Sequence, residues 1–115
     1  MQIDWDNVRV YIKPGATDMR KQYNGLAHMV TEVMGKDIYD GSLYVFCNKD
    51  RSILRVLYWE RNGLCIWTKR LERQRFPWPK DEQSARQIST EYFWMLLRGI
   101  DIFSEHTEIK IFKAV

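Results

Sequence analysis

The chain has 115 residues, of which 45% are hydrophobic, 14% aromatic and 29% charged. This length predicts one domain over residues 1–115, and the composition excludes a disordered chain. The net charge of +3 excludes a strongly basic protein, so a nucleic-acid interface would have to come from local clustering of charge.

No apolar run reaches the length needed to cross a membrane, and residues 1–10 lack the pattern of a signal peptide. The two cysteines, Cys47 and Cys65, have no CxxC spacing. We therefore expect a cytoplasmic protein with reduced thiols and no membrane partner. A disulfide between strands stays open as the alternative.

The first third of the chain predicts a strand followed by a long helix. Residues 8–12 alternate as a strand does, and a Pro-Gly turn ends them. Thr17 or Asp18 then serves as the N-cap of a helix whose apolar positions recur at helical spacing over residues 19–34. Gly35 is the predicted stop.

The most strongly patterned stretch is a predicted β-hairpin. After a strand at residues 43–47, two more strands span residues 52–59 and 64–71. Asn62-Gly63 lies between them and predicts a type I′ turn, in which both central residues take positive φ. Neither face of the first hairpin strand is purely polar, so we expect the hairpin at the centre of the sheet.

A basic and aromatic segment follows the hairpin, and only one acid, Glu72, opposes its charge. Its cations are Lys69, Arg70, Arg73, Arg75 and Lys80, interleaved with Phe76, Pro77, Trp78 and Pro79. Such a segment binds phosphates and stacks on bases, or it is a solvated strand end whose aromatics close the core. Composition alone favours the second alternative. We expect Arg73 and Arg75 to be exposed, and Trp78 to be buried and to anchor the segment to the hairpin.

The last third predicts a short edge strand at residues 86–88 and a second helix at residues 91–98. Ser89 or Thr90 caps this helix, and Gly99 ends it. The tail over residues 102–115 is weakly patterned, with a final strand at residues 108–113.

These elements predict an α+β fold. We expect a mostly antiparallel sheet of four to six strands, one long helix packed on it, and a second short helix near the C-terminus. His28 and His106 have no metal-ligand spacing around them, and the sequence contains no phosphate loop and no nucleophile motif. We therefore expect no enzyme, no metal and no cofactor.

Three ordered motifs carry a family resemblance over about residues 8–101. They are TDMRK with NGL at residues 17–21 and 24–26, then LYW, NGL, KRLER and RFPWP between residues 57 and 79, and LLRGID at residues 96–101. The chain resembles the TnpB-like accessory proteins encoded by the second open reading frame of insertion-sequence family sixty-six. It departs from the family pattern at Glu60-Arg61, where an acidic-Gly pair is common, and at Asn24, where Asp is common.

The resemblance implies a small accessory protein of DNA transposition, encoded beside a separate transposase, and it implies no defined biochemical activity. Together with the absence of catalytic motifs, it leads us to expect a non-enzymatic accessory whose partner is the transposase of the same element, with DNA at the transposon ends as a further candidate partner. Two roles stay open: contact with DNA through the basic aromatic segment, or docking on the transposase without DNA. Arg20 and Lys21 oppose the dipole of the predicted first helical turn, which suggests a phosphate or an acidic partner there, or an internal pair with Glu72 or another acid. If the helix packs beside the open end of the hairpin, one basic surface is expected from Arg20, Lys21, Lys69, Arg70, Arg73 and Arg75.

Overall fold

The structure is a computed structural model that describes residues 3–80 and 85–100. In chain order the elements are β1 (Val10–Ile12), α1 (Tyr23–Glu32), the 3-10 helix η1 (Ile38–Asp40), β2 (Leu43–Cys47), β3 (Ile53–Glu60), β4 (Gly63–Arg70), β5 (Arg86–Ile88) and α2 (Thr90–Leu97). The α+β class is therefore confirmed. The strand predicted at residues 108–113 lies outside the described residues.

The five strands form one mixed sheet in the order β4-β3-β2-β1-β5. β1 and β2 run parallel, whereas the pairs β2–β3, β3–β4 and β1–β5 are antiparallel. The expectation of a mostly antiparallel sheet is wrong because the chain leaves β1, passes through α1 and η1, and returns beside β1 in the same direction. Parallel neighbours need a long crossover of this kind, and residues 13–42 provide it.

The hairpin of β3 and β4 lies at the edge of the sheet, not at its centre, because β4 has a described neighbour on one side only. Its ladder continues to the pair of Glu60 and Gly63, so only Arg61 and Asn62 remain to make the turn. Arg61 has a φ of +53°, and the backbone N–H of Asn62 donates to the carbonyl of Glu60 at 2.6 Å. The hairpin is confirmed, but positive φ at both Asn62 and Gly63 is wrong.

Helix α1 begins at Tyr23 and has 10 residues, so the long helix predicted from residue 17 or 18 is wrong. The carboxylate of Asp18 accepts the backbone N–H of Arg20 at 2.9 Å, which forms an Asx turn instead of a helix cap. The backbone N–H of Thr17 donates to the carbonyl of Cys47 at 2.8 Å. These bonds hold the segment in a turn against the end of β2.

Three further local predictions are confirmed, whereas the first strand is Val10–Ile12 and so shorter than the predicted residues 8–12. Gly35 and Gly99 adopt the left-handed conformation after their helices, with φ of +66° and +81°. The hydroxyl of Ser89 accepts the backbone N–H of Tyr92 at 3.1 Å and so caps α2. β5 is an edge strand, paired antiparallel with β1.

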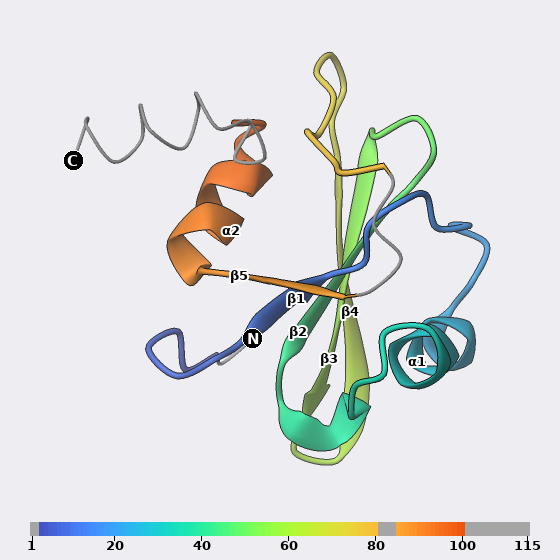
Figure 1. The fold of residues 1–115 in the computed structure, drawn as a ribbon, viewed down its shortest axis with the longest axis vertical. Helices are drawn as coiled ribbons and strands as arrows, with labels where there is room; N and C mark the ends of the chain where they lie inside the picture. Colours follow the sequence, from blue (N-terminus) through green and yellow to red (C-terminus); the bar gives the residue numbers. More distant parts are fainter. Residues whose placement is uncertain (1–2, 81–84, 101–115) are drawn as a thin grey trace.

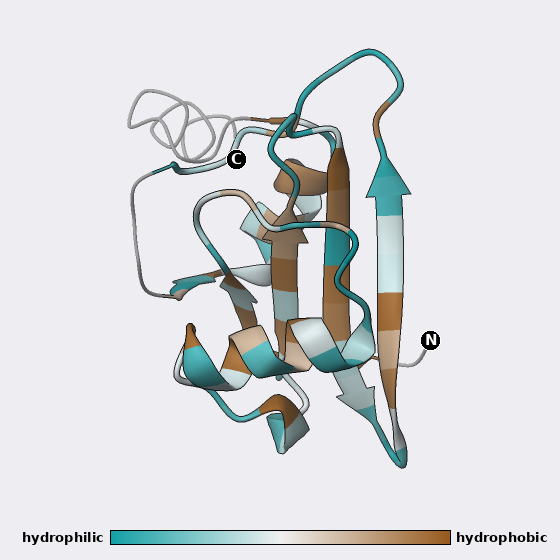
Figure 2. Ribbon diagram, turned by 90° about the vertical axis from the view of Figure 1, so that its right-hand side faces the viewer, coloured by the Kyte–Doolittle hydropathy of each residue, from teal (hydrophilic) through white to brown (hydrophobic). Residues whose placement is uncertain are grey.

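The two α-helices cover opposite faces of the sheet (Figure 1). Figure 2 shows α1 crossing the strands, with the apolar residues of the sheet behind it. Each face has its own hydrophobic core, and β3 contributes to both because its side chains alternate. The core under α1 contains Tyr11, Leu26, Val30, Met34, Ile38, Tyr44, Phe46 and Leu57. The core under α2 includes Val10, Ile12, Leu54, Val56, Tyr58, Phe76, Trp78, Phe93 and Leu96.

Candidate nucleic-acid interface

One end of the sheet gathers three connecting segments, seen at the upper right of Figure 1. The parallel strands β1 and β2 both leave the sheet there, and the pairing of Ile53 with Arg70 places the start of β3 and the end of β4 at the same end. We call residues 13–17, 48–52 and 70–80 the basic end. Backbone hydrogen bonds join its segments to each other and to β2: Thr17 N to Cys47 O at 2.8 Å, Phe76 N to Arg51 O at 2.7 Å and Gly15 N to Pro79 O at 2.8 Å.

The basic end carries more positive charge than the whole chain. Its three segments contain seven Lys or Arg residues and two acids, a formal charge of +5, whereas the chain has +3. The remainder of the chain is therefore slightly acidic. A surface of this kind attracts polyanions although the protein as a whole is only mildly basic.

Residues 70–80 place their aromatic side chains in the core and two of their arginines in solvent. Phe76 and Trp78 are buried, whereas Arg73 and Arg75 are exposed, as the sequence predicts. The indole N–H of Trp78 donates to the carbonyls of Lys13 and Gly15 at 3.1 and 3.0 Å. These bonds tie the segment to the turn after β1, and Trp78 also belongs to the hydrophobic core that includes Leu54, Val56 and Tyr58 of the hairpin strand β3.

The turn after β2 is fixed by the side chain of Asn48. Its carbonyl oxygen accepts the backbone N–H groups of Ser52 and Ile53 at 2.9 and 3.0 Å. Arg51 takes a φ of +59°, a conformation that costs a non-glycine residue about 1 kcal/mol or more. The turn presents Lys49 and Arg51 at the basic end.

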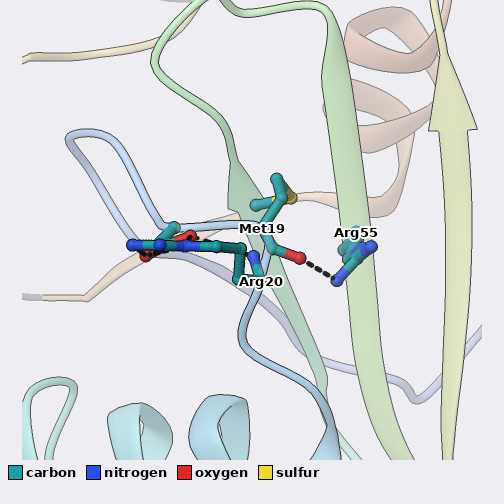
Figure 3. Close-up of polar contacts among 4 residues, drawn as sticks. Met19, Arg20 and Arg55 are labelled. Carbon is teal, nitrogen blue, oxygen red and sulfur yellow. Dashed lines mark hydrogen bonds and ion pairs between the residues drawn. The ribbon is translucent and has the colours of Figure 1, made fainter.

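Arg20 and Lys21 lie in the turn before α1, and an arginine of β3 holds that turn in place. Nη1 of Arg55 donates to the carbonyls of Met19 and Lys21 at 2.8 and 3.0 Å (Figure 3 shows the Met19 bond). The sequence predicts no functional role for Arg55, although a charged residue on a strand face that also carries Leu57 is a signal for such a role.

Arg20 has an internal partner, Asp18, at 2.7 Å, so the alternative of a pair with an acid other than Glu72 is the one formed. Hydrogen bonds from Arg20 lower the pKa of Asp18 to about 2. Lys21 is exposed. α1 begins after both residues, so they lie just before its N-terminus and not in its first turn as the sequence predicted.

Lys69 and Arg70 also have internal partners. Nζ of Lys69 donates to the carbonyl of Leu97 at 2.8 Å, a favourable contact between a cation and the C-terminus of α2. Arg70 pairs with Glu72 at 3.1 Å, with both side chains mostly exposed. Lys69 therefore points to the α2 side of the sheet, and the turn with Arg20 lies over Arg55 on the other side, so the six predicted residues do not form one continuous patch.

The structure adds cations from two other turns to those of the segment after β4. Lys13, Lys49 and Arg51 join Arg73, Arg75 and Lys80 at the basic end because β1 and β2 are parallel. Burial lowers the pKa of Lys13. Local sequence patterns do not predict that these cations lie together, since their position depends on the parallel pairing of two strands that are far apart in the sequence.

Other kinds of site find little support in the described residues. Both cysteines are free thiols, and burial raises the pKa of Cys47 to about 12, so this thiol is protonated and unreactive at neutral pH. Across residues 3–80 and 85–100, no three His, Cys, Asp or Glu side chains gather as metal ligands. Neither helix of that part has the length and hydrophobicity of a membrane-spanning segment.

A second surface lies between α2 and the hairpin. It is a pocket of about 240 Å³, here called the apolar pocket, and Trp67 and Trp94 at its border are 36% and 46% exposed. Exposed tryptophans beside an apolar hollow are typical of protein contacts. The other lining residues are Ile3, Trp5, Leu43, Val56, Phe93 and Leu97.

Comparison with known families identifies the chain. Residues 8–107 match the family model described as IS66 Orf2 like protein. The chain belongs to the IS66 Orf2-like family. The resemblance drawn from the TDMRK, RFPWP and LLRGID motifs is thereby confirmed, and membership implies an accessory role in transposition.

Two relatives of the IS66 Orf2-like chain come from Sinorhizobium fredii (strain NBRC 101917 / NGR234). The uncharacterized protein y4hO is 45% identical over 95 residues, which cover 83% of each chain. The uncharacterized protein y4jC is 33% identical over 94 residues, covering 82% of this chain and 80% of the relative. No solved structure matches the chain.

Proposed function

We propose that this IS66 Orf2-like protein is a non-enzymatic, cytoplasmic accessory of transposition that contacts DNA at the transposon ends through the basic end. The observation that carries the proposal is the +5 charge of three segments in a chain of net charge +3. Lys49, Arg51, Arg73, Arg75 and Lys80 provide the phosphate contacts. Arg20 and Lys21, in the turn that follows residues 13–17, offer two further cations, of which Arg20 is paired with Asp18.

The pattern of pairing supports this assignment. In the described part of the chain, the ion pairs are those of Arg20 with Asp18 and Arg70 with Glu72. Arg73 and Arg75 are exposed, and an exposed guanidinium group can bind a phosphate through two parallel hydrogen bonds. The buried Phe76 and Trp78 hold the segment, so its arginines project from a fixed base.

The test is a fluorescence-anisotropy titration of the protein with a transposon-end duplex at about 50 and about 200 mM salt. Each phosphate contact releases counterions, so log K should fall by roughly 0.9 per contact for each unit of log salt. The variant Arg73→Ala/Arg75→Ala should bind more weakly and should lower this slope by roughly two units.

The matched control is Arg9→Ala/Arg61→Ala, which removes two exposed arginines from the opposite end of the sheet. Both variants change the net charge equally, so a general charge effect would weaken them alike. The proposal requires that the Arg73/Arg75 variant lose affinity and that the control keep it. Equal binding by both variants contradicts it.

A second candidate function is docking on the transposase of the same element without DNA contact. The apolar pocket favours it, because Trp67 and Trp94 expose large aromatic surfaces beside it. Co-purification with the transposase should then be weakened by Trp94→Ala and left intact by Arg73→Ala/Arg75→Ala. Absence of DNA binding at low salt, together with co-purification, would decide for docking.

A further inference from the structure

A pocket of about 370 Å³ opens at the basic end, where its three segments meet. Gly15 comes from the turn after β1, Lys49 and Arg51 from the turn after β2, and Trp78 and Lys80 from the segment after β4. The pocket therefore exists only when folding brings these three distant segments together. Its volume is in the range of small-ligand sites.

The walls of this pocket combine three cations with no acid. Lys49, Arg51 and Lys80 line it, and no Asp or Glu is among its described lining residues. The ion pairs present in residues 3–80 and 85–100 involve other arginines, Arg20 and Arg70. Like charges held together in a hollow without a counter-charge favour an anion there.

A fourth cation lies next to the pocket. A Cβ built on Gly15 would come within 3.7 Å of Nζ of Lys13 and within 3.5 Å of the carbonyl of Lys80. Nζ of Lys13 therefore lies close to the Gly15 wall, and burial lowers its pKa. An anion in the pocket would offset part of the cost of burying this ammonium group.

The frame of the pocket is rigid. The positive φ of Arg51 is held between the carbonyl of Asn48, which accepts its N–H at 3.1 Å, and the N–H of Phe76, which donates to its carbonyl at 2.7 Å. Trp78 is 7% exposed and makes two hydrogen bonds, so it provides a fixed apolar wall beside the cations. A site that is pre-formed loses little conformational freedom when it binds.

We propose that this pocket binds the phosphate ester of one nucleotide, with the phosphate on Lys49, Arg51 and Lys80 and the sugar against Trp78. This inference rests on the proposed DNA contact and assigns one phosphate within it to a built site. The phosphate belongs to a 5′ strand end or to a backbone phosphodiester. Both sources share the same chemistry, and the test separates them.

The first measurement is binding of a short single-stranded oligonucleotide with and without a 5′-phosphate. Lys49→Gln/Lys80→Gln should lower affinity roughly tenfold at low salt, because two cations leave one phosphate. The control Arg9→Gln/Arg61→Gln should bind like the wild type. If the pocket binds a strand end, the wild type should bind the 5′-phosphorylated oligonucleotide more tightly and the Lys49/Lys80 variant should not. If it binds a backbone phosphate, the variant should lose the same affinity for both oligonucleotides.

The second measurement needs no DNA. Inorganic phosphate should raise the melting temperature of the wild-type protein above its value in chloride of equal ionic strength, because a ligand of the native state stabilises it. Lys49→Gln/Lys80→Gln should abolish this rise. Ala16→Glu, which places a carboxylate on an exposed residue at the pocket, should do the same with both lysines present.

The outcomes distinguish this inference from the proposed function. Wild-type DNA binding that falls with Arg73→Ala/Arg75→Ala and not with Lys49→Gln/Lys80→Gln overturns the pocket and keeps the DNA contact. A phosphate-dependent rise in melting temperature without DNA binding overturns the proposed function and keeps the pocket as an anion site. No phosphate effect and no loss in the lysine variant overturn the inference.

Discussion

The turns at the two ends of the sheet are stabilised differently. Each connects antiparallel strands through a turn that contains an arginine at positive φ, Arg51 at the basic end and Arg61 at the other. Arg51 is braced by the amide of Phe76 and by the Asn48 side chain, which ties the turn to β3. Arg61 sits in a tight two-residue turn on the exposed edge hairpin.

This difference indicates where strain is supported. At the basic end, the surrounding chain fixes the strained residue in a position that faces a pocket, so the conformation is part of a built site. In the hairpin turn, the strain is a local cost of a short connection. Measuring the free energy of unfolding of variants at both ends can therefore test whether buried residues hold the basic end in place while its exposed cations contribute little to stability.

The largest effect is expected from the anchor of the basic end. Trp78→Ala should lower the free energy of unfolding by about 3 kcal/mol or more, because it leaves a cavity and removes two hydrogen bonds to the turn after β1. Urea denaturation measures the change. Trp94→Ala, at a half-exposed tryptophan, is the control and should cost under about 1 kcal/mol. Equal costs would mean that Trp78 does not anchor the segment.

A smaller loss is expected from the brace of the turn after β2. Asn48→Ala removes the acceptor of two backbone N–H groups, so it should cost about 1–3 kcal/mol. The same substitution at the exposed Asn62 of the hairpin turn should cost less than about 0.5 kcal/mol. Thermal unfolding of the two variants compares the two ends directly. Equal losses of stability would contradict the claim that the Asn48 side chain braces its turn.

The hairpin turn should gain from relief of its strain. Arg61→Gly is expected to raise the free energy of unfolding by about 0.5–1 kcal/mol, because glycine adopts positive φ without steric cost. Gly63→Val should stay within about 0.5 kcal/mol, since Gly63 lies in β4 and an added Cβ meets nothing within 4 Å. A large loss in Gly63→Val would restore the predicted Asn62-Gly63 turn.

The smallest effect is expected from the exposed arginines of the basic end. Arg73→Ala/Arg75→Ala should change the free energy of unfolding by less than about 0.5 kcal/mol. Arg55→Ala, which leaves the carbonyls of Met19 and Lys21 without their donor, should cost more. Unfolding of the double variant would show that these guanidinium groups are structural.

The elements that local sequence patterns determine were predicted well. The β3–β4 hairpin, β2, β5 and the Ser89 cap of α2 each depend on residues within a few positions of one another. The start of α1 was missed because a short acidic side chain serves equally well as a helix cap and in an Asx turn. Here the carboxylate of Asp18 accepts the N–H of Arg20, which favours the turn.

The candidate site was predicted only in part, because its residues come from segments that are far apart in the sequence. Arg73, Arg75 and Trp78 lie in one segment, and their exposure and burial follow from local alternation of charged and aromatic residues. Lys49 and Arg51 join them through a parallel pairing of β1 with β2, which local periodicity does not encode. Arg70 was assigned to binding because an ion pair with Glu72 is invisible until both side chains are placed.

The position of β1 in the sheet sets an order of assembly during folding. The hairpin closes between neighbours, Glu60 and Gly63, and such hairpins form in microseconds, whereas Val10 pairs with Leu43 on one side and with Ile88 on the other. Closing loops of that length is slow, because chain entropy is lost before the contacts form. During synthesis the hairpin can therefore fold on the ribosome well before β1 receives its second neighbour. A nascent chain that ends before β5 leaves β1 with β2 as its one strand neighbour, although the described lining residues of the pocket at the basic end, from Gly15 to Lys80, have by then been made.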